Sequence, residues 1–323
     1  MAEKSVHPIC AFDIGQDGTV VPIREPWPSA TTGDGMSYRW LHFDLADKGL
    51  DAWTREFLPE TASTALRQSE TRPRSDFLDG GLILNLRGVN LNPASDVDDM
   101  VSLRLWVTKC LIVSARMRKV WAVDAIREEM DIGIAPKSVG MFLAALTYGL
   151  TKRIEEVTIE LEDESDAIEE EAFAGGQDMG GRVAQCRKSV IKLRRFIRPQ
   201  KEALIELAAN RDWLGNDAAS VLLRETANKT KRSLESLEAT HERLSATQDH
   251  LDILHATALG RNSYVLSIVA AIFLPLGFVT GLFGINVGGM PGVESDLGFW
   301  TVTVGSVVVG AALYAVFRYS KWL

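Results

Sequence analysis

The stretch Ser263–Pro291, SYVLSIVAAIFLPLGFVTGLFGINVGGMP, decides the architecture of this chain. Its first part, Ser263–Gly284, contains no Asp, Glu, Lys, Arg or His, and it is long enough to cross the roughly 30 Å hydrocarbon core of a bilayer as a helix. A second uncharged run, Leu297–Phe317, follows after a short loop and is also long enough. The sequence therefore predicts two C-terminal transmembrane helices, joined by an external loop over residues 285–298 and preceded by a large polar body.

The charge of the chain lies on this polar body. The formal net charge is −8, and the charged residues after position 262 cancel one another. An acidic body argues against nucleic-acid binding, which favours a basic face, and is compatible with attracting cations. The cysteines Cys10, Cys110 and Cys186 lie far apart without a C-x-x-C pair, so we expect reduced thiols in the cytosol.

Residues 1–150 alternate short apolar runs with helical patterns. Runs rich in β-branched and aromatic residues predict strands at Ile9–Ile14, Thr19–Ile23, Tyr38–Leu45, Gly81–Val89 and Leu103–Val113, the last divided by a hairpin turn at Thr108–Cys110. Helical patterns lie near Leu50–Leu58, Glu60–Ser69 and Val120–Met130. This alternation predicts a cytosolic α/β domain with a mixed sheet, and the strand order stays open.

Residues 137–215 predict a cytosolic helical hairpin with an acidic and a basic arm. Ten carboxylates and no base lie between Ile154 and Ala172, Gly175 and Gly176 then interrupt the helix, and Arg182 begins a strongly basic segment. On one interpretation the two arms attract each other; on the other, the acidic arm concentrates divalent cations near the membrane. Either interpretation requires partial neutralisation of the carboxylates.

A stalk helix is predicted over residues 216–262. Gly215 suits the end of a helix, and Asn216 or Asp217 suits the start of the next one. Apolar residues then recur every seven positions, without a phase shift at the membrane boundary, at Leu237, Leu244, Leu251, Ala258, Val265 and Ile272. We therefore expect one helix to run from the stalk into the first span and to associate laterally with other helices.

Opposite this apolar ladder lies a stripe of small residues. Its members are Ala256, Gly260, Ser263, Ser267, Ala270, Gly277 and Gly281, with Leu274 among them. The Gly277-x-x-x-Gly281 spacing is typical of close helix packing in membranes. The same weakly polar face also suits a water-filled axis enclosed by a ring of helices, so packing and pore lining are the two interpretations.

The stalk offers one candidate metal site, formed by Asp249, His250, Asp252 and His255. Asp252 and His255 are one helical turn apart, as two ligands of one ion require, and a solvated stalk face is the alternative. Neither span contains the His or Cys ligands that zinc favours, or a titratable carboxylate or histidine for a proton relay. Any binding of zinc by such ligands, or any relay of protons, would therefore depend on groups outside the spans.

The Gly284-Ile285-Asn286 segment, at the end of the first span, resembles the G-x-N signature of the CorA-type divalent cation transporters. The magnesium branch usually has Tyr-Gly-Met-Asn where this chain has Phe283–Asn286. The following Val287–Gly292, the segment Ser69–Arg74 and the terminal Ser320–Leu323 are similar to the zinc-transporting, ZntB-type branch. The resemblance extends over the whole chain.

The resemblance implies a homopentameric, CorA-like funnel in which the first span lines the pore and Asn286 forms a ring at the outer mouth. Neutral amide oxygens, with backbone carbonyls near Gly284, suit a hydrated divalent ion because they bind its water shell without stripping it. A carboxylate ring would hold the ion too tightly for release. Glu294 and Asp296 in the external loop would either attract cations or have no role.

The basic residues Arg261, Arg318 and Lys321 flank the spans, so the positive-inside rule places both termini, including the tail 318–323, in the cytoplasm. We expect a zinc-preferring transporter of the plasma (bacterial inner) membrane that is not an enzyme and has no permanently bound cofactor. The chain has no P-loop motif for ATP. Alternative ions are Co²⁺, Ni²⁺, Cd²⁺ and Mg²⁺, and the alternative class is a membrane-anchored sensor or scaffold without metal flux.

Overall fold

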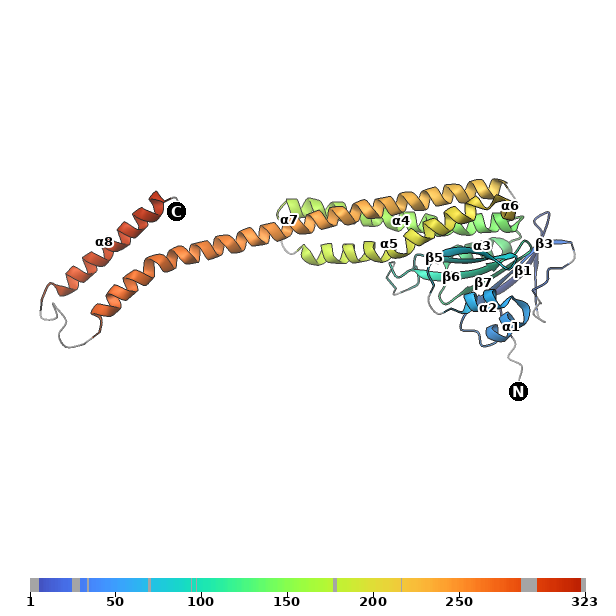
Figure 1. Ribbon diagram of the computed structural model, residues 1–323, viewed down its shortest axis with the longest axis horizontal. Helices are drawn as coiled ribbons and strands as arrows, with labels where there is room; N and C mark the ends of the chain where they lie inside the picture. Colours follow the sequence, from blue (N-terminus) through green and yellow to red (C-terminus); the bar gives the residue numbers. More distant parts are fainter. Residues whose placement is uncertain are drawn as a thin grey trace. The chain divides into compact units, whose positions relative to one another are not determined.

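The structure, a computed structural model, describes residues 6–24, 30–33, 35–68, 71–93, 95–96, 98–176, 179–215, 217–285 and 295–320. It contains two compact units, Met1–Gln248 (unit 1) and Asp249–Leu323 (unit 2). The elements in chain order are β1 (Cys10–Gly15), β2 (Val20–Pro22), β3 (Met36–Asp44), α1 (Leu50–Phe57), α2 (Glu60–Arg67), β4 (Arg74–Leu78), β5 (Gly81–Gly88), β6 (Val101–Val107), β7 (Leu111–Arg116), α3 (Trp121–Asp131), α4 (Val139–Phe173), α5 (Gly180–Ala209), α6 (Arg211–Leu214), α7 (Asp217–Phe283) and α8 (Gly298–Tyr319) (Figure 1).

The strands of unit 1 form one mixed sheet. Their order is β2-β1-β3-β7-β6-β5-β4, and the β3–β7 pair is parallel while the other neighbours are antiparallel. The mixed sheet and the tight β6–β7 hairpin confirm the sequence prediction. Strand β4 was not predicted, because its sequence RSDFL has no apolar alternation and only antiparallel pairing with β5 makes it a strand.

Helices cover both faces of this sheet (Figure 1). Side chains alternate between the faces of a strand, so Leu84 of β5 packs in a core with α3, α4, α5 and the first part of α7. Its neighbour Ile83 packs on the other face in a second core with α1 and α2. Phe142 of α4, Leu204 of α5 and Leu223 of α7 are all at most 1% exposed. The hairpin helices and the base of α7 therefore share the main core of the sheet domain.

A buried polar network joins the parallel strands β3 and β7. Ser114 Oγ accepts from Trp40 Nε1 at 2.9 Å, lies 2.8 Å from His42 Nδ1, and donates to the Leu41 carbonyl at 3.4 Å. Arg116 Nε donates to His42 Nε2 at 3.2 Å, so Nε2 must be unprotonated and Nδ1 must carry the ring proton. The network is satisfied only while His42 is neutral.

Acidification is expected to destabilise unit 1 through His42. Burial, and then the positive charge of Arg116, lower the pKa of His42 from 6.5 to about 3. Between these values the unfolded chain binds a proton that the folded chain does not, so the free energy of unfolding falls by about 1.4 kcal/mol for each pH unit of acidification. Thermal unfolding of the full chain in detergent, followed by tryptophan fluorescence at about pH 7.5 and about pH 4.5, measures this effect.

The variant His42→Asn supplies the comparison, because asparagine keeps a polar group but does not titrate in this range. Its stability is expected to change less between the two pH values than that of the wild type. The control His7→Asn, at a side chain that is 58% exposed, should keep the wild-type pH dependence. An equal pH dependence in the wild type and in His42→Asn would contradict this origin of the acid sensitivity.

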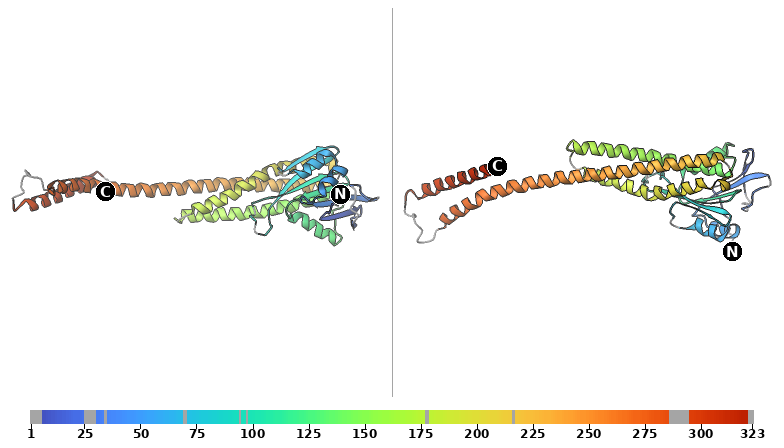
Figure 2. Two further views of the ribbon diagram at one scale, coloured as in Figure 1. Left: turned by 90° about the horizontal axis from the view of Figure 1, so that it is seen from below. Right: turned by 45° about the horizontal axis from the view of Figure 1, so that its top comes forward.

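Helices α4, α5 and the first part of α7 lie side by side in unit 1 (Figures 1 and 2). The ladder residues Leu237 and Leu244 of α7 are fully buried within the unit, so this part of the ladder packs within its own chain. Gly215 ends α6 with φ of 61°, a left-handed conformation that glycine adopts without strain. This turn confirms the predicted stop before α7.

The acidic arm of α4 forms ion pairs with both α7 and α5. Arg243 contacts Glu169 at 2.7 Å, and Lys229 lies 3.6 Å from Glu155. Among the described residues, α5 contributes two ion pairs to this arm, both from Arg182 at its start, which binds Glu164 at 3.0 Å and Glu171 at 2.6 Å. The attraction expected between the two arms is therefore concentrated at the hairpin end, and α7 pairs with three other carboxylates of the acidic arm, Glu155, Asp166 and Glu169.

Candidate metal-ion pathway

Unit 2 contains the C-terminal part of α7 and helix α8. Both helices are long and apolar enough to cross a membrane by length and composition. Helix α8 turns back along α7 (Figure 2), and large apolar side chains such as Phe273, Phe278 and Val307 are more than half exposed. Exposed apolar surface on this scale requires a lipid or protein environment, so these two helices are candidate membrane spans.

One face of α7 lies toward α8. The side chain of Leu276 reaches within 3.6 Å of the position that a Cβ would occupy at Gly310 of α8. Ile268, Ile272, Leu276 and Val279 are half-buried, and their spacing of three and four residues places them on one side of the helix. This side of α7 is the one that packs within the chain.

The predicted stripe of small residues lies on the opposite side of α7. Each residue advances the helix by about 100°, which places Ser267 about 180° and Gly277 about 100° around the helix from Leu276. Among the stripe residues at membrane depth, Ala270 is half-buried, and the exposed members are Gly260, Ser263, Ser267, Leu274, Gly277 and Gly281. A Cβ added at Gly260, Gly277 or Gly281 would have no neighbour within 4 Å. The stripe therefore faces away from the intrachain contact.

The stripe presents neutral oxygen atoms. Ser267 Oγ donates to the Ser263 carbonyl at 2.9 Å, which satisfies its proton and leaves its lone pairs available as acceptors. Thr280, beside the stripe, donates in the same way to the Leu276 carbonyl at 2.9 Å. Helix α7 then ends at Phe283, and the Gly284 amide still donates to the carbonyls of Thr280 and Gly281, at 2.9 and 3.1 Å.

The carbonyls of Leu282 and Phe283, the last two residues of the helix, have no donor within the helix itself. Ile285 is about half exposed, at 52%. Asn286 and Glu294, two of the predicted site residues, lie outside the described residues. Asp296 is exposed just before α8. The structure thus describes the stripe and the first two residues of the Gly-Ile-Asn segment.

The stalk residues Asp249, His250, Asp252 and His255 lie on consecutive turns of α7. Within the described part of the chain, no three His, Cys, Asp or Glu side chains come together in a way that could hold a metal ion. A site with three protein ligands is therefore not assembled there by one chain, and the Asp252–His255 pair stays a prediction. His241, further back on the stalk, lies near Arg194 and Arg187, and burial followed by these charges lowers its pKa.

Comparison with known proteins identifies the family of this chain. The family model described as "CorA-like Mg2+ transporter protein" matches residues 35–319. The zinc transport protein ZntB of Yersinia enterocolitica is 33% identical, with 88% of each chain covered. The divalent cation transporter CmaX of Pseudomonas aeruginosa is 36% identical, with 88% of this chain and 87% of that protein covered.

A solved structure is similar to this chain over its full length. The structure of the full-length CmaX protein is similar with a TM-score of 0.82 and 31% sequence identity, and the match covers 100% of both chains. The α/β domain, the long helix and the two C-terminal apolar helices are thus the architecture of that protein as well. The family model and these relatives together show that the chain belongs to the CorA-like Mg²⁺ transporter family.

Proposed function

We propose that this protein transports divalent metal cations across a membrane, with Zn²⁺ as its preferred ion. The observation that carries the proposal is the stripe of small residues on α7, which faces away from the contact with α8 and offers neutral oxygens along a membrane span. Membership of a transporter family supports the same function. Relatives named for zinc and divalent cation transport, each covered over most of its length, favour zinc.

The proposed pathway needs several copies of the chain. One α7 stripe provides only one wall, whereas a ring of copies with their stripes turned inward encloses a water-filled axis. We therefore propose a homopentamer in which Gly260, Ser263, Ser267, Ala270, Leu274, Gly277 and Gly281 line the pore. Gly284, Ile285 and Asn286 would form its outer constriction, with Asn286 as a ring of amide oxygens.

Neutral oxygens determine how such a pore handles its ion. Zinc prefers nitrogen and sulfur ligands, and the spans contain no His or Cys, so the ion would cross with its water shell retained. Hydroxyl, amide and carbonyl oxygens hydrogen-bond that shell and let the ion leave again. Co²⁺, Ni²⁺, Cd²⁺ and Mg²⁺ carry the same shell and are the competing ions. Transport requires neither a chemical step nor a bound cofactor, and no ATP site is needed.

The proposed orientation follows from the charges beside the spans. Arg261 precedes the first span, and Arg318 ends the second. Lys and Arg concentrate on the cytoplasmic side, so unit 1 and both termini would lie in the cytoplasm and the loop with Glu294 and Asp296 outside. In a bacterial cell this places the protein in the inner membrane.

The test is zinc flux into liposomes that contain the purified protein and an entrapped zinc-sensitive dye. Zinc entry faster than in protein-free liposomes is expected, and an inward proton gradient in parallel samples reveals whether protons contribute. Competition by Co²⁺, Ni²⁺, Cd²⁺ and Mg²⁺ ranks the ions. Well-folded oligomers that pass none of these metals would overturn the proposal and favour a sensor or scaffold.

A further inference from the structure

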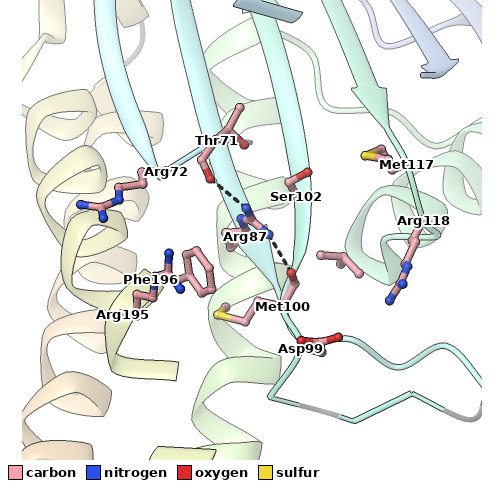
Figure 3. A pocket seen from close by; sticks show the side chains of 11 residues that line it. Thr71, Arg72, Arg87, Asp99, Met100, Ser102, Met117, Arg118, Arg195 and Phe196 are labelled. Atoms are coloured by element: carbon pink, nitrogen blue, oxygen red, sulfur yellow. Dashed lines mark hydrogen bonds between the residues drawn. The ribbon is translucent and has the colours of Figure 1, made fainter. Parts of the chain in front are cut away.

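A basic pocket lies in unit 1, where α5 passes the ends of strands β5 and β6. Its volume is about 580 Å³. We define it by four arginines and an aromatic ring, Arg72, Arg87, Arg118, Arg195 and Phe196. Figure 3 shows Arg87 near its centre, with Phe196 and Arg195 of α5 on one side and Arg118, which follows β7, on the other.

Arg87 is held firmly at the centre of the basic pocket. Its Nη1 donates to the Met100 carbonyl at 2.8 Å, and its Nη2 donates to the Thr71 carbonyl, also at 2.8 Å. The guanidinium lies 4.4 Å from the centre of the Phe196 ring, within the distance at which a cation is attracted to an aromatic face. The positive charge at the floor of the pocket is therefore fixed in position.

The other three arginines are exposed around this centre. Among the described residues, no carboxylate lies within ion-pair distance of Arg72, Arg118 or Arg195. Asp99 is the acidic residue of the lining, and its carboxylate already lies 3.9 Å from Lys192 Nζ. Among its described lining residues, the pocket thus gathers four positive charges against one negative charge.

The positive charge of the basic pocket contrasts with the net charge of the whole protein, which is −8. Elsewhere in unit 1, arginines such as Arg39, Arg182 and Arg243 are paired with carboxylates. Guanidinium groups that share one pocket repel each other, and a multivalent anion among them relieves this repulsion. The surplus of positive charge therefore indicates an anionic ligand.

We propose that the basic pocket binds a small anion that carries two or more phosphoryl groups. The planar guanidinium matches the oxygens of a phosphoryl group with two parallel hydrogen bonds, and several arginines fit several such groups. The volume of the pocket lies in the range of small-molecule sites, about 300–1,000 Å³. The pocket is therefore larger than a single phosphate ion would fill. Phe196, Met100 and Met117 add apolar wall for the rest of a metabolite.

The test measures binding by isothermal titration calorimetry on the full chain in detergent, with inorganic pyrophosphate and with ADP as separate probes. Binding of pyrophosphate and ADP with equal affinity means that the phosphoryl groups suffice, and tighter binding of ADP means that the nucleoside part also contacts the pocket. Either result supports the proposal. Affinity should fall as salt is raised, because the contacts are ionic.

The matched variants are Arg195→Ala in the pocket and Arg224→Ala on α7. Arg224 is also exposed and forms no ion pair with a described residue. Loss of one charge-assisted contact should weaken binding about tenfold or more in Arg195→Ala and leave it unchanged in Arg224→Ala. Equal weakening in both variants, or no binding of either probe, would overturn the proposal. So would a change of oligomer size in Arg195→Ala without a change in affinity, because the arginine would then serve a subunit contact.

Discussion

Replacing Asn286 with alanine is expected to reduce zinc entry into protein-containing liposomes to the rate of protein-free liposomes. In the proposed pentamer, the substitution removes the amide oxygen from every subunit at once. A hydrogen bond to a charged group contributes about 1.5–3 kcal/mol, and the hydrated ion would lose several such bonds at its narrowest passage. The entrapped zinc-sensitive dye measures the effect directly.

A matched control is available on the same helix. Asn262→Ala makes the same chemical change at an exposed residue of α7 that does not belong to the stripe, and it should transport zinc at the wild-type rate. Size-exclusion chromatography of both variants separates a loss of transport from a loss of assembly. Wild-type transport by correctly assembled Asn286→Ala would exclude the proposed ring of asparagines.

Substituting Gly281 with leucine is expected to close the pathway. A Cβ at Gly281 meets no atom within 4 Å in the single chain. Glycine is about 0.8–1 kcal/mol less favourable in a helix than alanine, and leucine ranks close to alanine, so the helix itself should tolerate the change. In a ring, each copy would add an isobutyl group to the axis, and an apolar constriction stops ions by excluding water. Zinc flux should fall to background while the oligomer stays assembled.

Gly305→Leu on α8 is the corresponding control, because a Cβ there also has no neighbour within 4 Å and the residue lies on the other span. It should keep most of the flux. If Gly281→Leu instead breaks the oligomer apart, or leaves the flux of each assembled oligomer unchanged, the stripe serves close helix packing. The lining of the pore would then have to be sought on another face.

The order of the spans, the long helix and most strands along the chain could be predicted from the sequence, because each of these elements has its own local pattern of apolar residues. The uncharged runs after Ser263 define the two spans, and the regular apolar ladder along Leu237 and Leu244 predicts one long helix. Strands such as β5 and β6 were predicted from runs of apolar residues, since both faces of the sheet are covered by helices. The short edge strand β4 lacks that signal and was missed.

The partners of individual side chains could not be predicted in the same way. The seven-residue ladder indicates that α7 packs against helices, but periodicity does not say whether those helices belong to the same chain. Similarly, the acidic run of α4 requires neutralisation, and only the packing shows that Arg243 and Lys229 of α7 supply part of it. The neutral state of His42 also depends on Ser114 and Arg116, which lie more than seventy positions away.

The two candidate sites also differ in whether they could be predicted from the sequence. The Gly284–Asn286 segment is contiguous, so the motif and its position after a span could be recognised from the sequence. The basic pocket brings together Arg72, Arg87, Arg118 and Arg195 from four separate segments. Isolated arginines in a chain of net negative charge give no sequence signal, and their proximity appears only when α5 packs against the sheet.

Labelling of single cysteines shows whether ions pass along the small-residue face of α7. Ser267→Cys places a thiol on that face, and Val269→Cys places one about 160° away around the same helix, both in a chain with the exposed Cys110 replaced by serine. A bulky, water-soluble thiol reagent is then added to zinc-transporting liposomes. If the stripe lines the pathway, zinc flux stops in Ser267→Cys and continues in Val269→Cys. Continued flux through Ser267→Cys after complete modification, or equal block of both variants, would contradict this pathway.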